Sequence, residues 1–220
     1  SANENDSLYF VSLIINSVKS GFFMAEQFDV ILSEKTYTPD HSCKQNSWIG
    51  DYTKAYNEFL KDPDAFWDKA AKELHWFTPY KKVKEWNYPF ARWFVGGKTN
   101  ITYNCLDRHV MSSRKNKVAL IWRGEDDTER IYTYRQLFRE MLKVANGLKK
   151  LGVKKGDRVC IYMPMVPEQI ISMLACARIG AVHSVVFGGF GAAALNSRIT
   201  GCGAKVVITA DSTFRRGKTI

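Results

Sequence analysis

Two short segments near the end of the chain carry residue types suited to an anionic ligand. The first is a glycine-rich turn, Phe187–Gly191, which follows the apolar run Ala181–Val186. The second is the polar, cationic segment Asp211–Lys218, which follows the apolar run Lys205–Ala210. Glycine lets a backbone approach a ligand closely, and arginine can bind two phosphate oxygens at once. We therefore expect the binding chemistry of the chain to lie in these two segments.

The segments around this pair alternate between strand and helix. Strands are expected at Lys117–Trp122, Arg130–Thr133 and Val159–Met163, and helical composition recurs in Ala192–Thr200. Such alternation builds a parallel sheet whose ligand crevices lie at the carboxyl ends of its strands. We predict an α/β fold, part of a doubly wound sheet subdomain, with both candidate segments leaving such ends.

Two helices of this subdomain have clear boundary signals. Thr133 and Gln136 stand three residues apart and predict a capping box, and Gly152 is expected to end that helix. Pro167 is expected to open the next helix and Gly180 to close it. The 3–4 spacing of apolar residues predicts two buried stripes: Leu137, Met141, Val144, Ala145, Leu148 and Leu151 in the first helix, and Val166, Ile170, Met173, Leu174 and Ala177 in the second.

The N-terminal half is expected to consist of an arm, residues 1–47, and a helical, aromatic segment, residues 48–112, before the α/β part at 113–220. Tyr52–Leu60 has helical spacing, and Asp62 is expected to cap a second helix that begins at Pro63. Residues 25–47 look extended and residues 76–94 look like a loop. A further helix, capped by Asn104 or Asp107, is expected to run to about residue 112.

Composition excludes several classes of protein. The net charge of +10 suits an anionic partner, but the cations are scattered, and no zinc-finger or ribonucleoprotein motif favours nucleic acid. Five widely spaced cysteines argue against a disulfide scaffold and for a reducing compartment. The four histidines are far apart, so no metal site is expected. Cys160 and Cys176 lie in apolar segments and are expected to be buried.

The apolar stretch Leu8–Met24 resembles a signal peptide only in part. Acidic residues precede it, Asn16 and Lys19 interrupt it, and it is too broken to span a bilayer. Because the chain opens with serine, our hypothesis is that residues 1–23 are non-native and that Met24 is the natural start.

The glycine turn admits a dinucleotide interpretation. Gly189, Gly191 and Ala194 fit the pattern G-x-G-x-x-A, and Asp211 stands at about the separation expected of a ribose-binding acid. Arg215 and Arg216 would then seat a 2′-phosphate, which makes NADP the ligand of an oxidoreductase module. The fingerprint normally follows the first strand of such a fold, whereas here at least three strands are expected before it.

A second interpretation comes from resemblance. Residues 48–220 resemble the N-terminal region of the AMP-forming acetyl-CoA synthetases, which belong to the adenylate-forming superfamily. The resemblance is carried by ITYNCLDRH at 101–109, YTYR at 132–135, LGVKKGD at 151–157, VCIYMPMVPEQIISMLACAR at 159–178, IGAVHSVVFGGF at 179–190 and VITAD at 207–211. These matches are long, so the resemblance is specific.

The resemblance implies an acetate–CoA ligase that is cytoplasmic and takes acetate, ATP with Mg²⁺, and CoA as its substrates. It implies that Phe187, Gly188 and Gly189 pack beside the CoA adenine, and that Arg215, Arg216, Gly217 and Lys218 bind the 3′-phosphate. No catalytic residue is identified in the chain, because the ATP loop, the acyl pocket and the catalytic lysine of the family belong to later sequence. We therefore expect an N-terminal piece of a larger enzyme that is inactive alone, with a non-catalytic remnant of the ligase as a further alternative.

Two departures from the family pattern stand out. Gly191-Ala192 replaces the usual Ser-Pro after the glycine turn, which removes a cap hydroxyl and predicts a looser helix start. Lys218 stands where the family has its second arginine, with Arg216 added beside Arg215. Positive charge is kept, but lysine does not reproduce the paired hydrogen bonds of arginine.

Overall fold

The computed structural model describes residues 37–212, 214, 215 and 217–219. The chain divides into two compact units, whose described residues run from 37 to 99 and from 100 to 219. The predictions on residues 1–36, including the start at Met24, and on Arg216 lie outside the described residues. Within the described ranges, no helix is long and apolar enough to cross a membrane.

The first unit begins with three helices: α2 (His41–Gln45), α3 (Tyr52–Lys61) and α4 (Pro63–Ala71). Each has an aspartate cap, because carboxylate oxygens of Asp40, Asp51 and Asp62 accept hydrogen bonds from backbone N–H groups at 2.8, 3.0 and 2.9 Å. The predicted helix at Tyr52 and the predicted cap at Asp62 are confirmed. The expectation of an extended arm is wrong at α2. Asp40 caps this helix, but its five residues are too few for a helical spacing of apolar residues to be recognised in the sequence.

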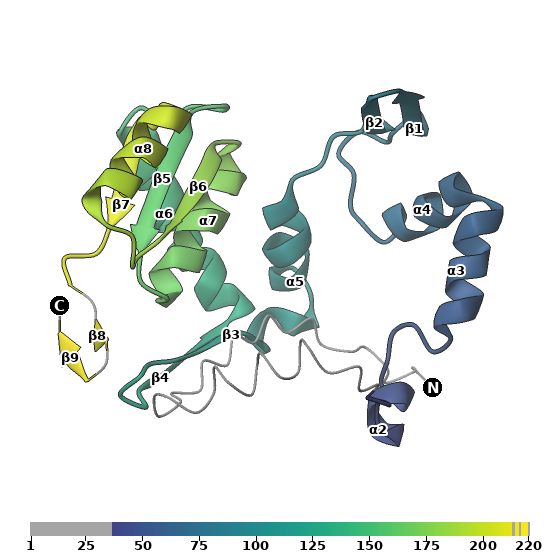
Figure 1. Cartoon of the computed structure of the whole chain (residues 1–220), viewed down its shortest axis with the longest axis horizontal. Coiled ribbons are helices and arrows are strands. Elements are labelled where there is room, and N and C mark those ends of the chain that lie inside the picture. The colour runs from purple at the N-terminus through teal and green to yellow at the C-terminus, as the bar shows by residue number, and fades with distance from the viewer. Residues whose placement is uncertain (1–36, 213, 216, 220) are drawn as a thin grey trace. The chain divides into compact units, whose positions relative to one another are not determined.

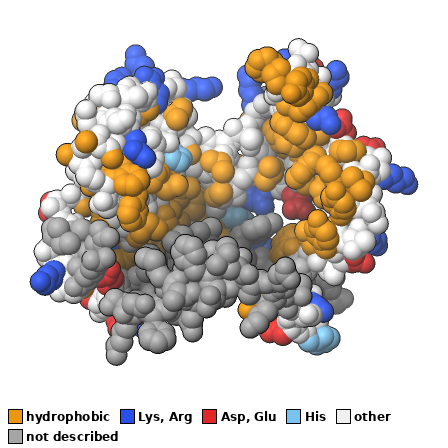
Figure 2. Space-filling view, viewed as in Figure 1, with side chains coloured by type: hydrophobic (Ala, Val, Ile, Leu, Met, Phe, Trp, Pro, Cys, Tyr) orange, Lys and Arg blue, Asp and Glu red, His pale blue; other side chains and the backbone are white. Residues whose placement is uncertain are grey.

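The aromatic segment after α4 is a hairpin, so the predicted loop at 76–94 is wrong. Strands β1 (Lys82–Asn87) and β2 (Phe90–Val95) pair antiparallel. The Trp76 indole donates to the carbonyl of Ala71 at 2.9 Å, and the Tyr80 hydroxyl donates to the Asp68 carboxylate at 2.6 Å. These bonds tie the segment to α4, and hydrophobic side chains lie exposed on this unit (Figure 2).

The second unit opens with a helix at residues 101–110 that contains a π-helical turn, Tyr103–Asp107, before α5 (Arg108–Val110). Neither predicted cap is correct, because the helix begins before both residues. The residue at its start is Asn100, whose side-chain oxygen accepts from the Thr102 N–H at 2.9 Å. The next segments are a 3₁₀ turn, η2 (Ser113–Asn116), and a hairpin of β3 (Val118–Arg123) and β4 (Glu129–Thr133).

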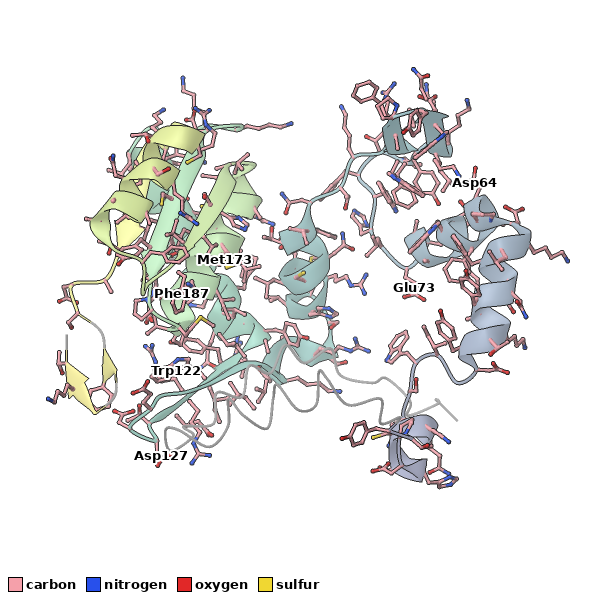
Figure 3. The ribbon with its side chains drawn as sticks, viewed as in Figure 1. Asp64, Glu73, Trp122, Asp127, Met173 and Phe187 are labelled. Carbon is pink, nitrogen blue, oxygen red and sulfur yellow. The ribbon has the colours of Figure 1, made fainter. Side chains whose placement is uncertain are left out.

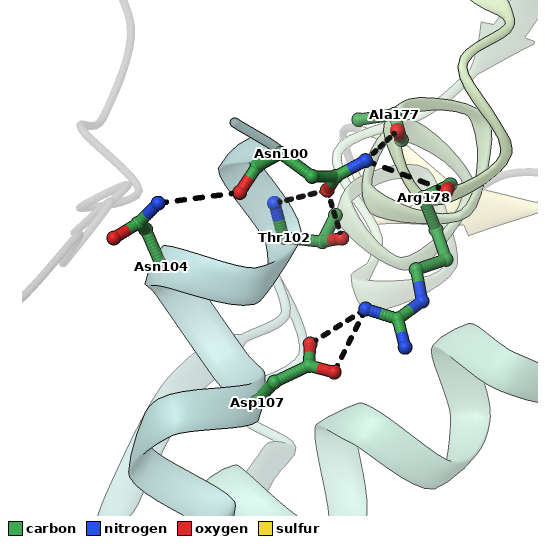
Figure 4. A network of polar contacts seen from close by, with 6 residues as sticks. All are labelled: Asn100, Thr102, Asn104, Asp107, Ala177 and Arg178. Atoms are coloured by element: carbon green, nitrogen blue, oxygen red, sulfur yellow. Dashed lines mark hydrogen bonds and ion pairs between the residues drawn. The ribbon is translucent and has the colours of Figure 1, made fainter. Parts of the chain in front are cut away.

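A polar network fastens this first helix to the rest of the unit (Figure 4). The Asn100 amide donates to the carbonyls of Ala177 and Arg178 at 3.0 and 3.4 Å. The buried Asp107 carboxylate pairs with the Arg178 guanidinium at 2.8 Å. A buried carboxylate needs such a partner, so Asp107, which was expected to act as a local helix cap, makes a tertiary contact instead.

The remaining elements form the α/β part of the unit: α6 (Tyr134–Lys150), β5 (Arg158–Met163), α7 (Pro167–Ile179), β6 (Val182–Phe187), α8 (Ala192–Cys202), β7 (Val206–Thr209), β8 (Phe214–Arg215) and β9 (Lys218–Thr219). The capping box of Thr133 and Gln136 is present in both directions, at 2.8 and 3.2 Å. Pro167 opens α7, and Gly180 follows it with φ +74°, as predicted.

The parallel sheet has the strand order β6-β5-β7, with β5 in the centre (Figure 1). Because β6 and β7 flank β5 on opposite sides, two right-handed crossovers place α7 and α8 on opposite faces of the sheet. This double winding confirms the predicted fold class, a partial adenylate-forming α/β fold. The β3–β4 hairpin is a separate antiparallel sheet, so two of the expected strands lie outside the parallel one.

The core of this unit lies between α6, α7 and the sheet. Buried side chains include Met141, Val159, Ile161 and Ala175. The predicted stripe of α6 is largely correct, although Leu151 is 65% exposed. The predicted stripe of α7 is only partly correct. Four of its five members, Val166, Ile170, Met173 and Leu174, are partly buried and pack against the core. The fully buried side chains lie beside them and include Gln169, Ile171, Ser172, Ala175 and Cys176. This helix is apolar on most sides, so periodicity could not select the face whose small side chains allow close packing.

Candidate ligand site at the carboxyl ends of the sheet

The glycine loop is held against the end of the central strand. A Cβ atom on Gly188 would lie 3.0 Å from the Met163 carbonyl oxygen and 3.4 Å from the Pro164 nitrogen. The Tyr162 hydroxyl, also on β5, donates to the carbonyls of Gly188 and Phe190 at 3.2 and 2.8 Å. The backbone of the loop is therefore fixed by close packing at Gly188 and by the hydrogen bonds from the Tyr162 hydroxyl.

Two aromatic rings frame the loop. Phe187, the last residue of β6, is labelled in Figure 3 and is 59% exposed. Its ring meets that of Phe190 edge to face, with the centroids 5.8 Å apart. A Cβ atom on Gly189 would lie 2.6 Å from the Phe187 ring, so a larger residue at this position would displace the ring. An exposed ring on a fixed backbone offers a surface for stacking a flat ligand group.

The cationic segment contains a hairpin rather than only a loop. The strands β8 and β9 pair antiparallel, with Arg215 opposite Lys218 in the backbone register and Gly217 in the turn at φ +73°. Lys218 is exposed. The hairpin follows β7 and the glycine loop follows β6, and both strands run parallel to β5. The predicted site residues other than Arg216 thus lie at or after the carboxyl ends of β6 and β7, the two strands that flank β5.

A polar cluster supports the connection that leaves β5. The Trp122 indole donates to the Met165 carbonyl at 2.6 Å, and the Arg130 guanidinium lies 4.8 Å from the centroid of the Trp122 ring. Arg130 also makes two hydrogen bonds to the Glu168 carboxylate, at 2.7 and 2.8 Å. These bonds lower the pKa of Glu168. Sequence reasoning missed the cluster because its members come from three separate elements.

The cysteines do not contribute a reactive thiol to this site. All five are free, and Cys160 and Cys176 are buried as expected. Burial raises the pKa of Cys176 to about 11, which keeps it protonated at neutral pH. Over residues 37–212 and the described parts of the last hairpin, no group of three or more His, Cys, Asp or Glu side chains could hold a metal ion.

Comparison with known proteins identifies two family models in the chain. The model described as "Acetyl-coenzyme A synthetase N-terminus" matches residues 52–105. The model described as "AMP-binding enzyme" matches residues 106–219, which include the parallel sheet, the glycine loop and the hairpin.

Curated relatives give the same result. The chain is 50% identical to an acetyl-coenzyme A synthetase of Chlorobaculum tepidum over 200 residues, or 89% of this chain and 30% of the relative. It is 53% identical to that of Deinococcus radiodurans over 170 residues, or 77% and 26%. It is 58% identical to that of Methanothrix thermoacetophila over 156 residues, or 70% and 24%. The matched region thus spans less than a third of the length of these relatives.

Proposed function

The chain belongs to the family of AMP-binding enzymes, and we propose that it forms the N-terminal part of an acetate–CoA ligase. The proposed enzyme joins acetate to ATP, giving acetyl-adenylate and pyrophosphate. The thiol of CoA then attacks the acetyl carbonyl and AMP leaves, giving acetyl-CoA. Mg²⁺ enters with ATP. The observation that carries this proposal is the identity of about half of the aligned residues to acetyl-CoA synthetases across both matched segments.

We further propose that this part of the enzyme contributes binding of CoA. Phe187, Gly188 and Gly189 would lie beside the adenine, for which the exposed ring of Phe187 supplies a stacking surface. Arg215, Arg216, Gly217 and Lys218 would bind the 3′-phosphate. The backbone register of the hairpin supports this role, because it sets Arg215 opposite Lys218, with Gly217 at a positive φ in the turn between them.

The test of the phosphate role is Arg215→Ala in the full-length protein. We expect the KM for CoA to rise ten-fold or more, since a charge-assisted hydrogen bond contributes about 1.5–3 kcal/mol. Acetate-dependent exchange of pyrophosphate into ATP should be unchanged, and the loss should be much smaller with 3′-dephospho-CoA. Equal losses with both thiols would remove Arg215 from the phosphate site.

The groups that form the adenylate are proposed to lie outside these residues. The 220-residue chain alone should therefore fail to exchange pyrophosphate into ATP in the presence of acetate. Exchange catalysed by the chain alone would refute this part of the proposal. We place the enzyme in the cytoplasm, where its five free thiols stay reduced.

The family matches favour the ligase over an NADP-binding module at the same glycines. The two interpretations differ in what Asp211→Ala does. Loss of nicotinamide nucleotide binding in that variant, with no competition by CoA, would support the oxidoreductase interpretation and oppose ours.

A further inference from the structure

Arg198 lies outside every motif considered so far, yet it contacts the glycine loop. Its guanidinium carbon is 4.4 Å from the centroid of the Phe190 ring, and its Nη1 donates to the Ala194 carbonyl at 3.2 Å. Arg198 stands four residues after Ala194 and eight after Phe190, so its side chain runs back along the first two turns of α8. The contact with the ring is a cation–π interaction anchored to the helix by a hydrogen bond.

The start of α8 needs such an anchor. Its cap residue is Gly191, which has no side chain to accept a hydrogen bond from the first turn. The residue just before the cap, Phe190, is instead held on two sides. The Tyr162 hydroxyl binds its carbonyl at 2.8 Å, and Arg198 covers its ring.

Phe190 in turn positions Phe187. The two rings meet edge to face at 80°, and the Phe190 N–H donates to the Phe187 carbonyl at 3.0 Å. Phe187 is the more exposed of the two rings, at 59% against 37%. A stacking surface that is already ordered in the free protein loses less side-chain entropy when a ligand binds.

We propose that Arg198 is a positioning residue for the adenine-stacking surface of the CoA site, acting through the Phe190 ring on Phe187. This inference rests on the proposed function. It predicts that Arg198 affects binding of the adenosine part of CoA and not binding of the 3′-phosphate. The cation of Arg198 is engaged by an aromatic ring, whereas the cations of the β8–β9 hairpin are proposed to meet phosphate.

The experiment compares Arg198→Ala with the parent full-length protein in acetyl transfer to three thiols. CoA carries both adenine and 3′-phosphate, and 3′-dephospho-CoA lacks only that phosphate. 4′-Phosphopantetheine lacks the 3′-phosphate, the adenosine and one of the two bridging phosphates. We expect the KM to rise about three- to ten-fold for CoA and equally for 3′-dephospho-CoA. The KM for 4′-phosphopantetheine and the rate of acetyl-adenylate formation should stay unchanged.

Two further variants separate positioning from general charge or stability effects. Arg198→Lys keeps the cation and should recover part of the lost affinity. Arg139→Ala removes an exposed helical arginine from α6 and should leave every KM unchanged.

Three results would overturn the inference. They are an unchanged KM for CoA in Arg198→Ala, an equal rise with 4′-phosphopantetheine, or a rise with CoA that disappears with 3′-dephospho-CoA. The last would make Arg198 a phosphate ligand. Failure of the proposed function is distinct, since the parent protein would then not transfer acetyl to CoA at all.

Discussion

The glycine loop after β6 and the hairpin after β7 hold their residues in different ways. The loop is fixed by contacts with β5, since Gly188 packs against the end of that strand and the Tyr162 hydroxyl binds two loop carbonyls. The rings of Phe187 and Phe190 also pack edge to face. The hairpin has two short strands paired with each other and an exposed Lys218. In the proposed CoA site this difference corresponds to a division of labour, in which the shape of the loop would recognise the adenine and the charge of the hairpin would recognise the 3′-phosphate.

The largest effect should come from breaking the shape of the loop. Gly188→Ala places a methyl group 3.0 Å from a backbone oxygen that cannot rotate away, so the loop must shift. Overpacking of this kind destabilises the native conformation by about 1–3 kcal/mol, and whatever part of that free energy must be recovered on binding lowers the affinity, up to roughly hundred-fold. We expect the KM for CoA and for 3′-dephospho-CoA to rise together, measured by acetyl transfer in the full-length protein.

Gly191→Ala is the matched control for this change. It adds the same methyl group to the same loop, but no heavy atom lies within 4 Å of the new position among the described residues. Its KM values should stay close to those of the parent. Equal losses in the two variants would show that the loop is sensitive to any added side chain and that packing at Gly188 is not special.

A smaller effect is expected from removing charge at the hairpin. Lys218→Ala should raise the KM for CoA a few-fold to about ten-fold at low salt, because an exposed cation loses strength as ions screen it. The loss should shrink as salt is added and should be absent with 3′-dephospho-CoA. Lys115→Ala, at another exposed lysine, serves as the control. A loss that does not depend on salt would contradict a role through charge.

The smallest effect is expected from removing the Tyr162 hydroxyl. Tyr162→Phe keeps the ring and removes the hydroxyl that donates to Gly188 and Phe190. Because a neutral hydrogen bond contributes about 0.5–1.5 kcal/mol, the KM for both nucleotide thiols should rise two- to ten-fold. The loss should not vary with salt. A salt-dependent loss would place Tyr162 with the hairpin rather than with the loop.

Local signals in the sequence predicted much of the fold. Thr133 with Gln136, Pro167 and Gly180 mark helix ends by chemistry that acts within a few residues, and the structure confirms each of them. The errors in the second unit occur where residues far apart in the sequence come into contact. Asn100 and Asp107 bind to α7 more than 70 residues away, and the buried face of α7 depends on which neighbours pack against it.

The same distinction between local signals and long-range contacts applies to the candidate site. The glycines and the cationic segment were visible as residue types at the ends of expected strands. Tyr162, Arg198 and the cluster of Trp122, Arg130 and Glu168 were not, because each acts through a contact that only the folded chain creates. Sequence thus indicates which groups would meet a ligand, and the structure adds the residues that hold them.

The measurement that tests the division of labour most directly is acetyl transfer by the full-length parent protein from prepared acetyl-adenylate to the three thiols. We predict that kcat/KM falls in two steps. The first step, from CoA to 3′-dephospho-CoA, should diminish with added salt, and the second, from 3′-dephospho-CoA to 4′-phosphopantetheine, should not. Equal kcat/KM values for the three thiols would show that neither the glycine loop nor the hairpin recognises the nucleotide, and would contradict the account.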